Sequence, residues 1–217
     1  MEVASEEYKR SALPLFTTLA FASAILAALV GYFIDDIGPI YSLFVPVSLL
    51  IIGALVKYGD QAFDSDAYCK KTAIYLALPT GVWLGALIML DESIAVIFIG
   101  MLLALLVARK YDNVAFRLAF AVAITLSLAA LLIIHGNISL IGIAVTFILA
   151  LLDEKIDALP ADDDYNTLAI IMRQRPLLKI GVFVLCITGV LPSFIYLFAF
   201  LSFDFGYSMV DVASTLR

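Results

Sequence analysis

Apolar runs of membrane length follow one another along almost the whole chain, free or nearly free of charged residues. They lie at about Ser11–Ile34, Gly38–Val56, Thr72–Leu90, Ser93–Ala108, Val114–Ile134, Ile138–Leu152 and Leu177–Phe203. Most approach the ~20 residues that a helix needs to cross the hydrocarbon core of a bilayer. Lipid offers no hydrogen-bond partners, whereas a helix satisfies its own backbone groups. The sequence therefore predicts an all-α integral membrane protein, folded as a multi-span helical bundle.

Composition supports this class, and no linker or low-complexity tract divides the chain. The 217 residues are 64% hydrophobic with a mean hydropathy of +1.07, values beyond those of soluble domains. We expect a single transmembrane domain over residues 1–217. The last run is either one long span or two helices broken near Gly189 and Pro192, since proline removes a backbone donor. The broken form favours eight helices, within a range of seven to nine.

The basic residues give the expected orientation. If every run spans the membrane, they fall on one side: Lys9, Arg10, Lys57, Lys70, Lys71, Arg109, Lys110, Arg117, Lys155, Arg173, Arg175 and Lys179. The connections at 35–36, 91–92 and 135–137 contain no basic residue. The positive-inside rule then predicts a multi-pass protein of the cell membrane, with its N-terminus and charged loops in the cytoplasm. No basic groove for nucleic acid is visible.

Two of the charged loops contain an Asp-x-x-x-Asp. Asp60 and Asp64 follow the second run, and Asp66 lies half a turn round from Asp64. Asp153 and Asp157 follow the sixth run. A spacing of four places both carboxylates of a pair on one face of a helix. A solvated acidic loop is the competing interpretation, but Asp60 and Asp153 lie at the hydrocarbon boundary, where an unpaired carboxylate is costly and tends to be functional.

These carboxylates suit Mg²⁺, which takes oxygen ligands together with phosphate oxygens and water. Nearby cations would neutralise the remaining oxygens of a diphosphate. The candidates are Lys70, Lys71, Arg109, Lys110 and Arg117. The positive-inside signal alone also explains Lys70 and Lys71. Arg117 lies inside the fifth run, about one turn from its end, so we expect it to be buried and paired with an acid.

Other classes of site lack the residues that they require. A hydrolase triad or a zinc site needs histidine, and the only one, His135, lies in a short turn on the other side. No phosphate-binding or dinucleotide-binding fingerprint is present. A transporter predicts polar residues along one face through the middle of the membrane, and those in the apolar runs are scattered. They are Thr17, Thr18, Ser48, Ser127 and Thr146.

Taken together, the motifs resemble those of the UbiA superfamily of intramembrane prenyltransferases, whose Asp-rich motifs follow the second and sixth helices. The first motif matches at Phe63-Asp64, with Asp60 in place of the family's Asn and Tyr68 in place of its last Asp, for which Asp66 is a substitute. The second matches Asp153 and Asp157, followed by Asn166-Thr167-Leu168-Ala169 and Arg173. The segment Arg109-Lys110-Tyr111 with Asn113-Val114 resembles the family's link between the fourth and fifth helices. Within the chain, Lys110-Tyr111 is also similar to Lys57-Tyr58.

The resemblance implies a UbiA-like bundle that uses Mg²⁺ and transfers an isoprenyl group from a prenyl diphosphate to a hydrophobic acceptor. The metal ligands would be Asp60, Asp64, Asp66, Asp153 and Asp157. Lys110 and Arg117 would draw charge from the departing diphosphate, assisted by Arg109, Lys70, Lys71 and Arg173. Because the first motif departs from the family pattern, two alternatives stay open. One is a catalytically silent isoprenoid-binding homologue in membrane lipid, and the other is a small transporter or cation-binding membrane protein.

Overall fold

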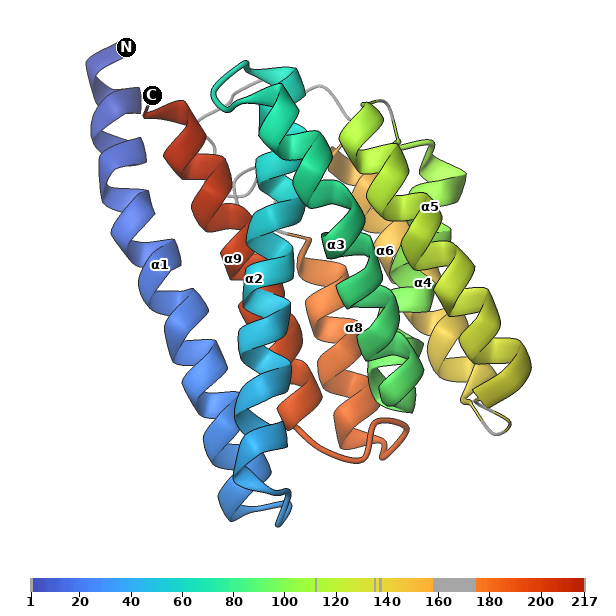
Figure 1. The fold of residues 1–217 in the computed structure, drawn as a ribbon. Helices are drawn as coiled ribbons and strands as arrows, with labels where there is room; N and C mark the ends of the chain where they lie inside the picture. Colours follow the sequence, from blue (N-terminus) through green and yellow to red (C-terminus); the bar gives the residue numbers. More distant parts are fainter. Residues whose placement is uncertain (1, 112, 135, 137, 158–174, 217) are drawn as a thin grey trace. The chain divides into compact units, whose positions relative to one another are not determined.

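The computed structural model describes residues 2–111, 113–134, 136, 138–157 and 175–216, and these residues are helical with short connections and no strand. The helices are α1 (Glu2–Phe33), α2 (Pro39–Asp64), α3 (Lys70–Leu90), α4 (Glu92–Ala108), α5 (Val114–Ala129, continued by a π-helical turn at Ala130–Ile134), α6 (Leu140–Asp157), α8 (Pro176–Ile187) and α9 (Ile195–Thr215) (Figure 1). The prediction of an all-helical chain is therefore confirmed for the described residues.

Among the described residues, five helices are long and apolar enough to cross a membrane. The segments are Ala12–Phe33, Pro39–Asp64, Lys70–Leu90, Val114–Ile134 and Ile195–Thr215, while α4 and α8 are apolar but shorter. Of the two alternatives left open for the C-terminal run, the structure has the broken one, because α8 ends at Ile187 and α9 begins at Ile195. Gly189 lies in this break with a φ of +74°, a conformation that glycine adopts without the steric penalty of a side chain.

The contacts divide the chain into two compact units. Unit 1 comprises Met1–Leu84, Asn113–Ala123 and Ser193–Arg217, and unit 2 comprises Gly85–Asp112 and Ile124–Pro192. In unit 1, α9 packs against both α1 and α2, which also touch each other (Figure 1). In unit 2, α6 packs against both α4 and α8. Each unit contains one of the two helices that end in an acidic pair.

Glycines set the close approach of α2 and α9 in unit 1. A Cβ added to Gly206 would lie 2.6 Å from the carbonyl oxygen of Leu50, and one added to Gly53 would overlap the carbonyl of Phe203. Small residues allow membrane helices to bring their backbones into contact. The resulting register places the end of α2, with Lys57 and Asp60, beside the end of α9.

Candidate functional site

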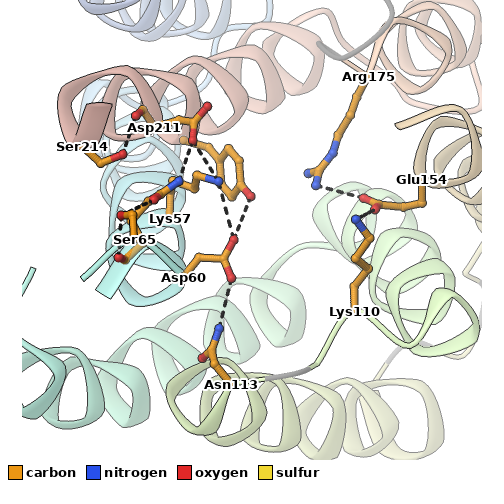
Figure 2. Close-up of polar contacts among 11 residues, drawn as sticks. Lys57, Asp60, Ser65, Lys110, Asn113, Glu154, Arg175, Asp211 and Ser214 are labelled. Atoms are coloured by element: carbon orange, nitrogen blue, oxygen red, sulfur yellow. Dashed lines mark hydrogen bonds and ion pairs between the residues drawn. The ribbon is translucent and has the colours of Figure 1, made fainter. Parts of the chain in front are cut away.

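Asp60 lies near the end of α2 at the centre of a polar cluster in unit 1. The amide of Asn113 donates to Asp60 Oδ1 at 3.1 Å, and the hydroxyl of Tyr207 donates to Oδ2 at 3.3 Å (Figure 2). The ammonium of Lys57 lies 3.6 Å from the same Oδ2. Both oxygens of the predicted metal ligand are therefore engaged by groups of the protein, which come from α2, α9 and the residue preceding α5.

Lys57 lies between two carboxylates. Its ammonium is 3.0 Å from Asp211 Oδ1, its side chain is only 12% exposed, and it lies 4.8 Å from the centre of the Tyr207 ring, within range of a cation–π interaction. Gln61 also donates to Asp211 Oδ1, at 2.8 Å. Sequence reasoning missed Asp211 and Tyr207. The available signal was their spacing of four, which places Tyr207 and Asp211 on one face of the C-terminal helix.

Asn113 was selected from the sequence through the family motif, and the structure gives it two roles. Its side-chain oxygen accepts the backbone N–H of Phe116 at 2.7 Å, so it caps the start of α5. Its amide nitrogen is the group that donates to Asp60. Asn113 is buried, at 8% exposure. The structure thus brings together two residues, Asn113 and Asp60, that the sequence motifs had indicated separately.

The remaining candidates after α2 lie on the exposed side of the same loop. Asp64 is the last residue of α2 and is exposed. Asp66, at a φ of +54°, pairs with Lys70 at 2.6 Å, but the two side chains are 76% and 50% exposed. Lys71 is exposed as well, whereas Tyr68 stacks on Tyr58, with the ring centres 4.4 Å apart. Asp66 and Lys70 therefore form a solvent-exposed pair, which contributes little to stability.

In unit 2, Asp153 caps the start of α8. It is 1% exposed, and its two oxygens accept the backbone N–H groups of Leu178 at 2.8 Å and Leu177 at 3.2 Å. Burial raises the pKa of the Asp153 carboxyl above its ordinary value, while these hydrogen bonds and the charge of Arg175 oppose that shift. The residue before α8, Arg175, supplies no capping hydrogen bond from its side chain, so Asp153 fulfils that role from α6.

Glu154, which the sequence motifs did not single out, is the centre of a second polar cluster in unit 2 (Figure 2). Its side chain is 4% exposed, with Arg175 Nη2 at 2.9 Å from Oε1 and Lys110 Nζ at 3.5 Å from Oε2. Consecutive residues of a helix point about 100° apart, so Asp153 can contact α8 while Glu154 contacts the two cations. Lys110 is a predicted diphosphate ligand, and its partner Glu154 emerges from the structure alone.

The other predicted residues occupy varied positions. Arg117 lies in the first turn of α5 and is exposed, so the prediction that it is buried is wrong. Because the helix begins only three residues earlier, the long side chain can reach the surface. Arg109 ends α4 in a left-handed conformation and is exposed, and Tyr111 is half-buried. Arg173 and the side chain of Asp157 lie outside the described part of the chain.

The fit to a magnesium ion is partial. Within the described residues, no group of three or more His, Cys, Asp or Glu side chains is arranged to hold a metal ion. Asp60 and Asp153 already accept hydrogen bonds from the protein. Mg²⁺ is usually bound by one or two carboxylates together with phosphate oxygens and water, and Asp64 and Asp66 are the predicted ligands whose side chains are exposed.

The fold and these clusters define a class. In its described residues the protein is helical, with five candidate membrane spans and with charged side chains at the ends of α2 and α6. No family model, no curated protein and no solved structure matches the chain. Its place in the UbiA superfamily is therefore a proposal that depends on the residues described above.

Proposed function

We propose that the protein is a Mg²⁺-dependent intramembrane prenyltransferase, which transfers an isoprenyl group from a prenyl diphosphate to a lipid-soluble or glycerol-phosphate acceptor. One observation carries the proposal: α2 and α6 both end on an Asp-x-x-x-Asp, at Asp64 and Asp157. The helix macrodipole disfavours an acid in the last turn by about 0.3–1 kcal/mol. A cation bound at each of these acids would offset that cost.

The proposal includes a UbiA-like bundle of seven to nine spans in the cell membrane, with the ends of α2 and α6 on the cytoplasmic side. The five candidate spans support it, and so does the absence of basic residues from the sequence connections 35–36, 91–92 and 135–137. The isoprenoid tail would lie in the apolar interior, and the diphosphate at the charged end of the bundle.

The reaction breaks the bond between the allylic carbon and the diphosphate oxygen, and the bonding electrons leave with the diphosphate. The acceptor then bonds to the allylic carbon and loses a proton. Bound Mg²⁺ would neutralise part of the charge that develops on the leaving group. Asp64 of the α2 pair and Asp157 of the α6 pair are the candidate ligands for such an ion, and Lys110 would stabilise the departing diphosphate.

The test is the release of diphosphate from geranylgeranyl diphosphate by the purified protein in lipid nanodiscs, with Mg²⁺ or with EDTA, across the acceptor classes. We expect Mg²⁺-dependent release, and Asp64→Asn and Asp157→Asn should each reduce it by about a hundredfold, as for other groups that stabilise developing charge. Asp36→Asn is the matched control, because Asp36 is an exposed acid before α2, at a φ of 52° that Asn tolerates. Absence of release with every acceptor would refute the proposal.

A second candidate is an isoprenoid-binding homologue without catalysis. The specific observation in its favour is that Asp60 and Asp153 accept protein hydrogen bonds, so neither is a vacant ligand for a metal. This function predicts saturable binding of geranylgeranyl diphosphate with no release of diphosphate, and the nanodisc assay separates it from the enzyme.

The transporter alternative gains one observation from α9. Ser202, Asp204 and Ser208 are all buried within this candidate span, and a buried acid in a membrane span is costly unless it serves a function. The hydroxyl of Ser202 bonds to the carbonyl oxygens of Pro46 and Ala199, which is a packing role. A cation flux in liposomes that Asp204→Asn abolishes would favour transport over prenyl transfer.

A further inference from the structure

Asp204 is a buried acid in the middle of a candidate membrane span. It is 4% exposed, and at a rise of about 1.5 Å per residue it lies about 14 Å from the start of α9 and about 17 Å from its end. The other acids of the candidate spans, by contrast, lie in the last two turns of their helices. An ionisable side chain in the middle of a span is costly and marks a functional site by default.

Asp204 lies on a side of α9 that differs from the two sides packed against α1 and α2. Gly206 approaches the backbone of α2, and the ring of Phe205 packs against α1. Because consecutive residues of a helix point about 100° apart, Asp204 points to a third side. Ser208 and Asp211 follow it at spacings of four and three and therefore share this side, and Ser208 is buried as well. A polar side of α9 thus runs from the middle of the helix to its C-terminal end.

Tyr207 gives the depth of Asp204 relative to the candidate site of unit 1. The hydroxyl of Tyr207 donates to Asp60 Oδ2 at 3.3 Å, and Asp204 precedes Tyr207 by about one turn of the helix. In the proposed reaction, the diphosphate lies at the charged end of the bundle and the allylic carbon is the first atom of the apolar tail. An acceptor that attacks this carbon needs its reacting group just below the charged end. Asp204 lies at that depth.

The side chains around Asp204 on α9 indicate the chemistry of such an acceptor. Aromatic rings lie within four residues of it, at Phe200, Phe203 and Phe205, and the hydroxyl of Ser208 lies one turn away. A carboxylate accepts hydrogen bonds, and aromatic rings provide an apolar surface. A neutral, lipid-soluble compound with a hydroxyl group suits both features. A phosphate ester suits neither, because like charges repel strongly at low dielectric.

We propose that Asp204 and Ser208 bind the hydroxyl group of a neutral, lipid-soluble compound, and that Asp204 selects such a compound over a phosphate ester. The carboxylate of Asp204 accepts a charge-assisted hydrogen bond from the hydroxyl, while Ser208 donates to or accepts from the same group. That this compound is the acceptor of the isoprenyl group rests on the proposed function, which assigns no residue to the acceptor and includes a glycerol phosphate among the possible classes. The binding itself does not depend on catalysis.

The experiment compares three probes of one shape: 4-octylphenol, its methyl ether 4-octylanisole, and 4-octylphenyl phosphate. Saturable binding of tritiated 4-octylphenol is measured on the full-length protein in phosphatidylcholine nanodiscs, without Mg²⁺ or prenyl diphosphate. Empty nanodiscs give the partition into lipid, and competition by the other two probes gives their affinities at the same site. We expect the phenol to bind about ten- to hundredfold more tightly than the ether, the effect of a hydrogen bond to a charged group.

Two variants of Asp204 separate the hydrogen bond from the charge. Asp204→Leu, which is apolar and of similar size, should reduce the preference for the phenol over the ether to less than about threefold. Asp204→Asn keeps a hydrogen-bond acceptor and removes the charge, so it should narrow the gap between the phenol and the phosphate by at least about tenfold. A purely structural role would change the three affinities in parallel and leave both ratios as they are.

The two buried serines of α9 provide a matched control. Ser208→Ala should reduce the preference for the phenol by about three- to tenfold, as expected for a neutral hydrogen bond. Ser202→Ala removes the same group from the side that bonds to the carbonyl oxygen of Pro46, and it should change the preference less than about twofold.

The inference is wrong if the wild type shows no saturable binding of 4-octylphenol or no preference for it over the ether. It is also wrong if the preference survives in Asp204→Leu, or if Ser202→Ala reduces it as much as Ser208→Ala does. Binding of the phenol that depends on Asp204, without prenyl transfer to any acceptor, would refute the prenyltransferase proposal and leave this site in place. Prenyl transfer with a phenol preference that Asp204 does not affect would refute the site and leave the enzyme, so the two failures are distinguishable.

Discussion

Lys57 is the residue whose removal most directly tests the polar cluster of unit 1. Its ammonium is shared by Asp211 at 3.0 Å and Asp60 at 3.6 Å, and its side chain is 12% exposed. Lys57→Met keeps the length and the apolar stem of the side chain and deletes the charge. The two carboxylates would then lose their common cation, and we expect the protein to be destabilised.

The magnitude follows from the exposure of the partners. Breaking a fully buried ion pair costs about 3–5 kcal/mol, and an exposed pair contributes about 0–1 kcal/mol. Asp60 and Asp211 are 21% and 47% exposed, so the cluster lies between these limits. We expect Lys57→Met to cost about 2–3 kcal/mol, and the coupling between Lys57 and Asp211 to be about 1–2 kcal/mol in a double-mutant cycle with Asp211→Asn.

Unfolding in mixed micelles of increasing dodecyl sulfate, followed by the fluorescence of Trp83, measures these free energies. Trp83 is the only tryptophan of the chain and lies on α3, within unit 1. The control cycle uses Lys70→Met and Asp66→Asn, an exposed pair whose ion-pair distance is shorter, at 2.6 Å. If burial decides the energy, this closer pair should couple by less than about 0.5 kcal/mol.

Two results would refute this reasoning. One is additivity within about 0.5 kcal/mol for Lys57 and Asp211, which would mean that their contact contributes nothing measurable. The other is a larger coupling for Lys70 and Asp66 than for Lys57 and Asp211. Distance rather than burial would then set the strength of these pairs.

Three further predictions concern packing, capping and a thiol. Gly53→Ala should destabilise the protein by about 1–3 kcal/mol, because the added Cβ would overlap the backbone of α9. The control is Gly38→Ala, whose added Cβ meets nothing within 4 Å. Equal stabilities of the two variants would contradict the α2–α9 contact. Asp153→Ala should lower the free energy of unfolding by about 0.5–2 kcal/mol, because the helix loses its cap, and it should accelerate hydrogen exchange at the first amides of α8. Unchanged exchange would count against the cap. Hydrogen bonds from Thr72 at the start of α3 lower the pKa of the exposed Cys69 thiol, so its alkylation should reach half-maximal rate at a lower pH than that of a free cysteine. An impermeant maleimide should label Cys69 only from the cytoplasmic side, and labelling of intact cells would reverse the proposed orientation.

Local sequence signals predicted the helices well. Apolar run length predicted seven spans, and five helices among the described residues are long and apolar enough to cross a membrane. The glycine and proline between Ile187 and Ile195 indicated the C-terminal break as one of two alternatives, and the structure has it. Both features depend on short segments alone. The bilayer requires every spanning segment to satisfy its own backbone hydrogen bonds, and a proline removes a backbone donor wherever it occurs, whatever the distant residues are. The aspartate pairs could be found for the same reason, since a spacing of four is local.

The partners of those aspartates could not be predicted in this way. Lys57 and Asp211 are far apart in sequence, and their contact depends on the helix register that Gly53 and Gly206 allow. Asp153 was predicted as a ligand because it lies at the end of an apolar run, and the structure adds a role that no local pattern indicated: it caps the start of α8. The burial expected of Arg117 failed because α5 begins only at Val114.

Stability alone does not account for the two clusters. Replacing a buried ion pair by apolar residues of similar volume is often neutral or stabilising, by about 1–4 kcal/mol, and apolar side chains suit the ends of membrane helices. In unit 1, Lys57 lies between the carboxylates of Asp60 and Asp211, and in unit 2 Glu154 pairs with Arg175 and Lys110. Each unit therefore has a buried charge where an apolar side chain would fold as well, which in each case favours a role beyond folding.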